Sequence, residues 1–125
     1  MPYTQETLIF KKLYELIKLI YNYVKLFPKH EKFILGQRIE NTSIDILEGI
    51  IKANKKDNKT KELENTSTKL DMLKVYIRLS KELQFMDLKR YEALSSHILE
   101  IGKMLGGWIK YEKNRLNQQK ILPTR

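Results

Sequence analysis

The sequence predicts an all-α fold, an antiparallel up-down-up-down four-helix bundle in a single domain. Apolar residues recur at steps of three and four along four long segments, and no segment alternates as a strand does. The corners after the first and third helices are short. With 125 residues, 42% of them hydrophobic, the chain can form one substantial core. We expect a bundle domain over residues 1–116 and a flexible C-terminal tail over residues 117–125.

The first helix is predicted over residues 4–27. Its apolar stripe steps by three and four, and lysines follow the opposite face. Pro28, the only proline in the interior, lies in the corner LFPKHEK and ends this helix. The stripe consists of Phe10, Leu13, Ile17, Ile20, Val24 and Phe27.

The second helix is predicted over residues 31–55, with a wide apolar face made of two neighbouring rows. One row is Leu35, Ile39, Ile46, Ile50 and Ala53, and the other is Ile44, Leu47 and Ile51. The stretch KANKKDNKTKELENTSTK then loses apolar residues and reads as a polar connector, with the next helix beginning near Lys61.

The third helix is predicted from about Lys61 to Phe85, and Asp87 is a suitable N-cap for the fourth. The third helix again carries two apolar rows: Leu70, Leu73 and Ile77 beside Met72, Tyr76, Leu79, Leu83 and Met86. The fourth helix has the most regular stripe in the chain: Tyr91, Leu94, Ile98, Ile101, Leu105 and Trp108.

The excess of basic over acidic residues indicates an anionic partner. The chain has 24 Lys and Arg against 15 Asp and Glu, a formal charge of +9. Nucleic acid is the commonest partner of such a domain, while an anionic membrane surface and simple solubility are alternative explanations. The absence of cysteine fits a reducing compartment, and no run of 18 apolar residues predicts a membrane span, so we expect a cytoplasmic protein.

The sequence offers no pattern for catalysis or for a cofactor. His30 and His97 lie far apart and have no partner at metal-ligand spacing. The Glu-x-x-His pattern of di-iron bundles, a glycine-rich phosphate loop and a nucleophile elbow are all missing. We therefore expect a protein that is not an enzyme and that binds neither cofactor nor metal.

Basic residues form two ridges at helical spacing. Lys74, Arg78 and Lys81 share one side of the third helix, and Lys103, Lys110 and Lys113 share one side of the fourth. Such a ridge can follow phosphates, although a lysine row is equally typical of the solvent face of a soluble bundle.

Three glycines surround the only tryptophan, Trp108, in the stretch EIGKMLGGWIK. Each costs a helix about 1 kcal/mol relative to alanine. Gly102 and Gly106 are four residues apart and Gly107 is adjacent, so they open a trough that admits a neighbouring helix or large side chain. That neighbour is a helix of the same chain or an adjacent protomer, and we favour the protomer interface.

Two stretches resemble known proteins. FPKHEKFILGQRIENTSIDILEGIIKAN, residues 27–54, resembles the second-helix signature of the four-helix bundle proteins of 23S rRNA intervening sequences. KLDMLKVYIRLSKELQFMDLKRYEALSSHILEIGKMLGGWIK, residues 69–110, resembles the accessory variability determinant (Avd) proteins of diversity-generating retroelements, a branch of that superfamily. The segments that weigh most are Leu105 to Ile109, and Leu73 with Lys74 and Arg78.

The resemblance implies a basic, barrel-shaped homopentamer without a catalytic site. It would bind the element's reverse transcriptase and nucleic acid and support adenine-directed mutagenic copying of a template-repeat RNA into cDNA. Carried onto this chain, the resemblance points to Lys74 and Arg78 as contacts with polymerase or RNA, followed by Arg38, Lys81, Lys103 and Lys110. The alternative is a generic oligomeric bundle of the intervening-sequence type with an interaction or RNA-binding role. Because lysine outnumbers arginine, we expect salt-sensitive binding rather than sharp base recognition.

Overall fold

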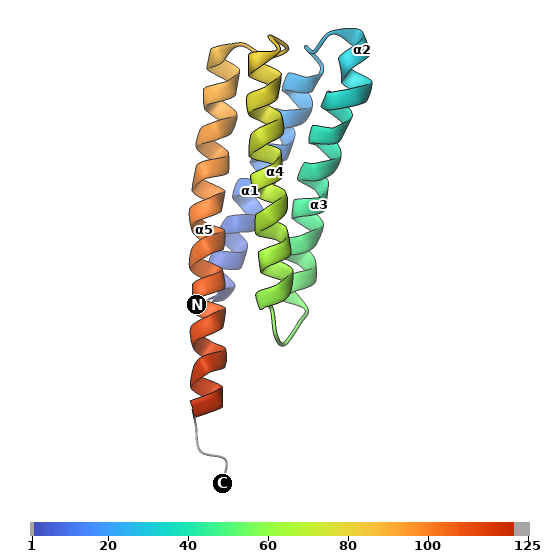
Figure 1. Ribbon diagram of the computed structural model, residues 1–125. Coiled ribbons are helices and arrows are strands. Elements are labelled where there is room, and N and C mark those ends of the chain that lie inside the picture. The colour runs from blue at the N-terminus through green and yellow to red at the C-terminus, as the bar shows by residue number, and fades with distance from the viewer. Residues whose placement is uncertain (1, 122–125) are drawn as a thin grey trace.

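The protein is a bundle of four helical rods (Figure 1). The computed structural model describes residues 2–121, and side chains over residues 8–119. Helix α2 (Lys29–Glu31), the π-helical turn η1 (Lys32–Gly36) and α3 (Gln37–Asn54) follow one another without a break and form one rod. The other rods are α1 (Pro2–Val24), α4 (Thr60–Glu82) and α5 (Leu88–Ile121). The described part of the chain contains no strand, and the predicted fold class is confirmed.

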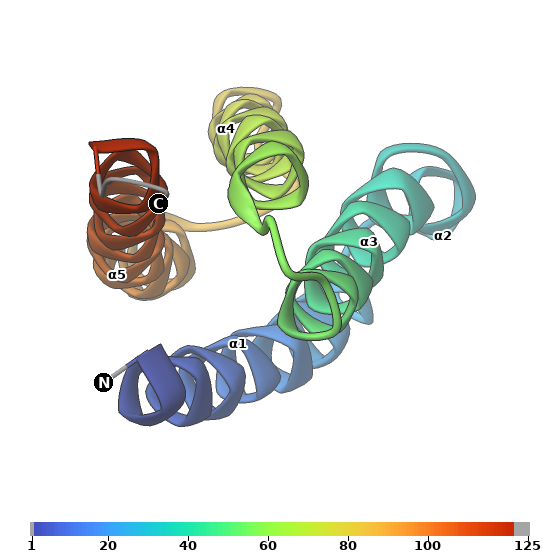
Figure 2. The same ribbon diagram turned by 90° about the horizontal axis from the view of Figure 1, so that it is seen from below.

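Each rod packs against two others, in the order α1, α3, α4, α5 and back to α1 (Figure 2). The α1–α2 and α4–α5 corners lie at one end of the bundle, where the rings of Phe27 and Phe85 are 5.8 Å apart. The α3–α4 connector lies at the other end, and α5 projects beyond it (Figure 1). The predicted flexible tail begins at residue 117, whereas the structure continues α5 as helix to Ile121; residues 122–125 lie outside the described part.

The core is one hydrophobic cluster with members from all four rods. The predicted stripe of α5 is confirmed from Leu94 to Trp108, whose side chain is completely buried. The prediction for α1 is wrong at Phe10, which is 42% exposed and stacks on Tyr14 while Ile9 takes its place in the core. The reason is geometric: a repeat of seven drifts about 20° per two turns around a straight α-helix, so Phe10 has rotated out of the interior.

The second apolar rows of the second and third predicted helices lie partly at the surface. The row containing Leu70, Leu73 and Ile77 is buried. In the second rows Met86 is buried and Ile44, Leu47 and Tyr76 pack against the core, whereas Ile51, Met72, Leu79 and Leu83 are exposed. An α-helix in a bundle buries a stripe of limited width, so the outermost of these residues meet solvent in a single protomer.

The glycines that permit close helix packing are Gly36 and Gly49, which sequence reasoning did not single out. A Cβ on Gly36 would lie 2.7 Å from Val24 Cγ1, so this glycine lets the start of α3 approach α1. A Cβ on Gly49 would collide with the side chain of Thr66, so this glycine lets α3 approach α4. Both contacts depend on tertiary structure and have no local signal in the sequence.

The α4–α5 corner is fixed by two capping interactions. Phe85 N donates to Ser80 O (2.8 Å) and Gln84 N donates to Lys81 O (3.0 Å), the pattern of a Schellman motif. Gln84 has φ 68°, the left-handed conformation that such a motif requires. Asp87 Oδ1 accepts a hydrogen bond from Arg90 N (2.9 Å), so the predicted N-cap is confirmed.

Candidate nucleic-acid and polymerase interface

Lys74 and Arg78 lie on the outer surface of α4. Both are exposed, and no ion pair engages either of them within residues 8–119. Lys74 is one turn after Leu70, whose Cδ2 is 3.7 Å from the position of a Cβ on Gly102 of α5. The two cations therefore lie toward the α5 edge of α4, with their charges available to a partner.

Lys81 occupies the same edge but is partly engaged within the protein. Its ammonium lies 4.8 Å from the ring centroid of Tyr91 on α5, a cation–π contact. It also lines a shallow hollow at the α4–α5 corner together with Phe85, Met86 and Arg90. Lys81 thus helps to hold the corner as well as adding positive charge to this face.

Lys103 and Lys110 project from the outer face of α5. They are two turns apart, exposed, and engaged in no ion pair within the described side chains. Helices α4 and α5 pack side by side (Figure 2), so five of the six predicted cations lie on two neighbouring helices. Lys113, the third lysine of the predicted α5 ridge, instead pairs with Glu64 of α4 (2.9 Å).

Arg38 is separate from that group. It belongs to α3 and lies in a groove formed where η1 and α3 meet α4, on the side of α4 that faces α3. The structure therefore does not bring Arg38 together with Lys74 and Arg78. The residues that line the groove are Glu31, Ile34, Leu35, Arg38, Tyr76, Leu79 and Leu83.

Sequence reasoning missed this groove. Its lining is mainly apolar: Ile34 and Leu83 are about half exposed, and Glu31 and Arg38 supply charges of both signs. An exposed apolar patch of this kind is typical of a protein interface. Its signal in the sequence is the second apolar row of α4, which contains Tyr76, Leu79 and Leu83.

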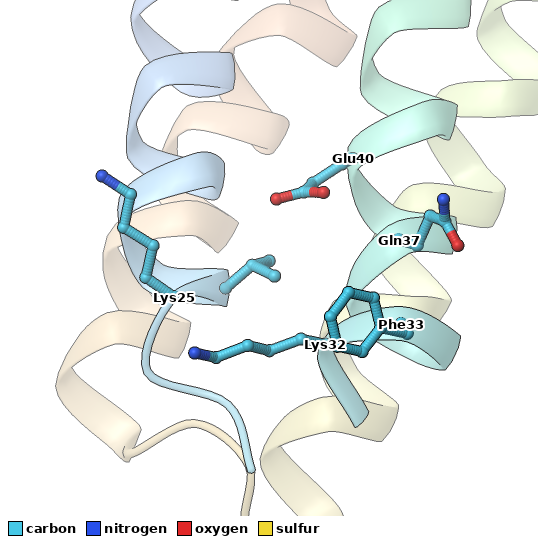
Figure 3. A pocket seen from close by; sticks show the side chains of 6 residues that line it. Lys25, Lys32, Phe33, Gln37 and Glu40 are labelled. Carbon is cyan, nitrogen blue, oxygen red and sulfur yellow. The ribbon is translucent and has the colours of Figure 1, made fainter. Parts of the chain in front are cut away.

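A second hollow lies at the seam of α1 with η1 and α3 (Figure 3). Glu40 and Lys32 extend into it from the α3 rod, with Lys25 on the α1 side, and Phe33 on its rim is 70% exposed. Burial raises the pKa of the Glu40 carboxyl above its ordinary value. The hollow thus mixes two ammonium groups with a carboxyl that is harder to ionise than a surface glutamate.

The glycine trough on α5 is open in the single chain. A Cβ on Gly106 would meet no atom within 4 Å, and Gly107 is exposed. A Cβ on Gly102 would make only ordinary contact with Leu70. Within the part of the chain that the structure describes, no helix occupies the trough at Gly106, and the side chain of Trp108 is buried in the core.

The described residues contain neither a metal-binding cluster nor a membrane-spanning helix. No group of three or more His, Asp or Glu side chains there is placed to hold a metal ion. His97 bonds through Nδ1 to Ala93 O (2.9 Å), within its own helix, and His30 is exposed. No described helix combines the length and apolarity needed to cross a membrane.

A family model described as bAvd-like matches residues 7–112. The chain belongs to the bAvd-like family. The match runs from α1 to Glu112 of α5 and includes Arg38 and every predicted cation on α4 and α5. The resemblance to Avd proteins inferred from residues 69–110 is thereby confirmed. The curated proteins with which the chain was compared contain no match.

Proposed function

We propose that this bAvd-like protein is a non-catalytic accessory protein of a diversity-generating retroelement. It binds the reverse transcriptase and the template-repeat RNA or its cDNA, and so supports mutagenic reverse transcription in the cytoplasm. The observation that carries the proposal is the family match over residues 7–112. The charge of +9 and the cations on α4 and α5 that make no ion pair within the described side chains support it, because a basic protein attracts an anionic partner such as nucleic acid.

The chemistry of the α4 edge suits a contact that is charged and partly apolar. Arg78 offers a planar fork that can hold a carboxylate or a phosphate with two parallel hydrogen bonds. Lys74 adds a point charge, and the neighbouring Val75 is about half exposed. An arginine beside exposed apolar surface is typical of the energetically important part of a protein interface.

Self-association is part of the proposal, with a homopentamer as the expected assembly. One apolar groove lies where η1 and α3 meet α4. Helices α1 and α3 carry further exposed apolar side chains outside this groove: Phe10, Tyr14, Tyr21 and Ile51. Two distinct apolar faces on one protomer favour a head-to-tail contact, which closes into a ring when the rotation allows. The open trough at Gly102, Gly106 and Gly107 is a third candidate contact.

Co-expression of the chain with the reverse transcriptase of the proposed retroelement tests the proposal. We expect the wild type to co-purify with the polymerase and its RNA. We expect Lys74→Ala with Arg78→Ala to keep the helical circular dichroism while polymerase or RNA retention falls about tenfold to a hundredfold, the range for losing charged hydrogen bonds.

A matched control keeps the loss of charge the same. Lys11 on α1 and Lys25 directly after α1 are exposed, so Lys11→Ala with Lys25→Ala removes two charges from another face and should retain both partners. Equal retention by wild type and the Lys74/Arg78 variant would remove those residues from the site. A wild type that binds no polymerase would instead favour the intervening-sequence type of bundle protein.

A further inference from the structure

The end of the bundle that carries the α3–α4 connector is strongly basic. Residues 52–61 contain five lysines and one aspartate, in a stretch that the sequence predicts only as a polar connector. Four of these lysines are exposed, and Lys56 is 3.9 Å from Glu62. We call this surface the connector end and define it by Lys52, Lys55, Lys56 and Lys61.

The connector is held in one conformation by its fifth lysine. The Lys59 ammonium donates to the carbonyl oxygens of Ala53 (3.2 Å), Asn54 (3.2 Å) and Lys56 (2.6 Å). These are carbonyls at the C-terminus of α3, where a cation also favours the helix dipole. Lys59 therefore has a structural role, and it fixes the backbone from which its exposed neighbours project. A partner loses less conformational entropy on binding to such a pre-ordered loop.

Helix α5 projects past this end (Figure 1) and is tied to the connector. Arg115 Nη2 donates to the carbonyl of Asp57 (2.8 Å) and to Glu112 Oε1 (2.8 Å). Glu112 is only 1% exposed, and its carboxylate forms an ion pair with the Arg115 guanidinium. The connector and the projecting part of α5 thus form one joined surface, with the helix standing beside the basic loop.

The inward row of α5 changes character at this point. The buried stripe of α5 is apolar at Ile98, Ile101, Leu105 and Trp108. The same steps of three and four then lead to polar residues: Glu112, Arg115 and Gln119. Exposed amides at Asn114, Asn117 and Gln118 surround this part of the row, and Leu116 is the one apolar side chain among residues 112–119. Such a surface is suited to a polar partner rather than to an apolar peptide or a lipid bilayer.

We propose that the connector end is a separate binding site for single-stranded nucleic acid, held through its phosphates. The lysines of the connector contact the backbone, while amides on the projecting part of α5 lie beside the sugars and bases. Within residues 52–61 the only apolar side chain, Ala53, is buried, so nothing there can insert into a membrane. Lys61 and Lys74 are 13 residues apart on one helix, about 20 Å, which is roughly two screening lengths at physiological salt. The connector end is therefore electrostatically separate from the cations at Lys74 and Arg78.

The proposal deepens the proposed function by adding a nucleic-acid site, and the test uses the full chain without polymerase. Binding of a short unstructured RNA is measured by fluorescence anisotropy over a series of salt concentrations. Lys55→Gln, Lys56→Gln and Lys61→Gln together should lower the slope of log K against log salt by about 2, since each contact with single strands contributes about 0.7.

The control variant carries Lys11→Gln, Lys18→Gln and Lys25→Gln, the same charge change on exposed positions of α1 and directly after it. We expect its slope to stay within about 0.5 of wild type, and both variants to keep wild-type circular dichroism. Equal slopes for the two variants would overturn the connector end as a site. Binding of phosphatidylserine vesicles as tight as binding of RNA would overturn the assignment to nucleic acid.

Polymerase co-purification separates this proposal from the proposed function. The connector variant should retain the polymerase, because its substitutions lie away from Lys74 and Arg78. A lower salt dependence of RNA binding in the connector variant, with the polymerase still retained, supports the connector end as a site. This holds even if the Lys74/Arg78 variant retains both partners. Loss of polymerase in the connector variant would show that this end contacts protein and would overturn the proposal.

Discussion

Replacing Gly49 with alanine tests how closely α3 and α4 approach. The added methyl group would collide with the Thr66 hydroxyl and come within 3.2 Å of its Cβ. Thr66 is buried, and its Oγ1 donates to Glu62 O (2.8 Å), so the side chain has little freedom to move. Overpacking of this kind costs about 1–3 kcal/mol, against a gain of about 1 kcal/mol in helix propensity. We therefore expect Gly49→Ala to lower the free energy of unfolding by up to about 2 kcal/mol.

Urea unfolding followed by circular dichroism measures this change, and a double-mutant cycle assigns its cause. Thr66→Ala removes the colliding hydroxyl, so the double variant should recover at least about 0.5 kcal/mol relative to the sum of the single variants. Additive effects, or a more stable Gly49→Ala protein, would refute the close contact. Gly106→Ala is the opposite control: with open space around it, it should stabilise by up to about 1 kcal/mol.

The remaining predictions concern a cap, a carboxyl group and the glycine trough. Gln84→Gly should raise the free energy of unfolding by up to about 1 kcal/mol, since glycine adopts φ 68° without strain; a loss of stability in urea would contradict this. Because the pKa of Glu40 is raised in the folded state, the folded protein binds the carboxyl proton more tightly than the unfolded chain does. The contribution of Glu40 to stability therefore falls as the pH rises from the ordinary pKa of a glutamate through the raised pKa. Glu40→Gln should remove that slope, which unfolding curves across this pH range would reveal; identical profiles would exclude the effect. Gly106→Leu should reduce the assembled mass by light scattering while circular dichroism is unchanged, and normal assembly would place the trough outside the interface.

The degree to which sequence predicts this fold differs between helices for a physical reason. In α5 the stripe from Leu94 to Trp108 lies over the centre of the bundle, where period and burial agree. In α1 the stripe drifts, so that Phe10 leaves the core. The sequence does not distinguish a wide buried face from a buried stripe beside an exposed one, which is why the groove at Leu79 was missed.

In the candidate site, too, the sequence predicts relations within one helix but not relations between helices. Spacing along one helix correctly predicts that Lys74, Arg78 and Lys81 share an edge of α4, because this relation is local. Whether Arg38 joins them depends on how two rods pack, and the structure places it in the groove on the side of α4 that faces α3. The connector end was missed because its binding surface is formed by α3, α4 and the projecting part of α5 together, joined by the bond from Arg115 to Asp57.

Cyclic assembly would give the connector end a collective property. In a closed ring every protomer has the same orientation to the axis, so every connector end lies on the same rim. One RNA strand that contacts several protomers binds the later ones at high effective concentration, without any new kind of contact. Lysine point charges suit this arrangement, because weak and repeated phosphate contacts hold a strand without fixing its sequence. The salt slope of the assembled protein should then exceed that of a single protomer, and Gly106→Leu should lower both the assembled mass and that slope.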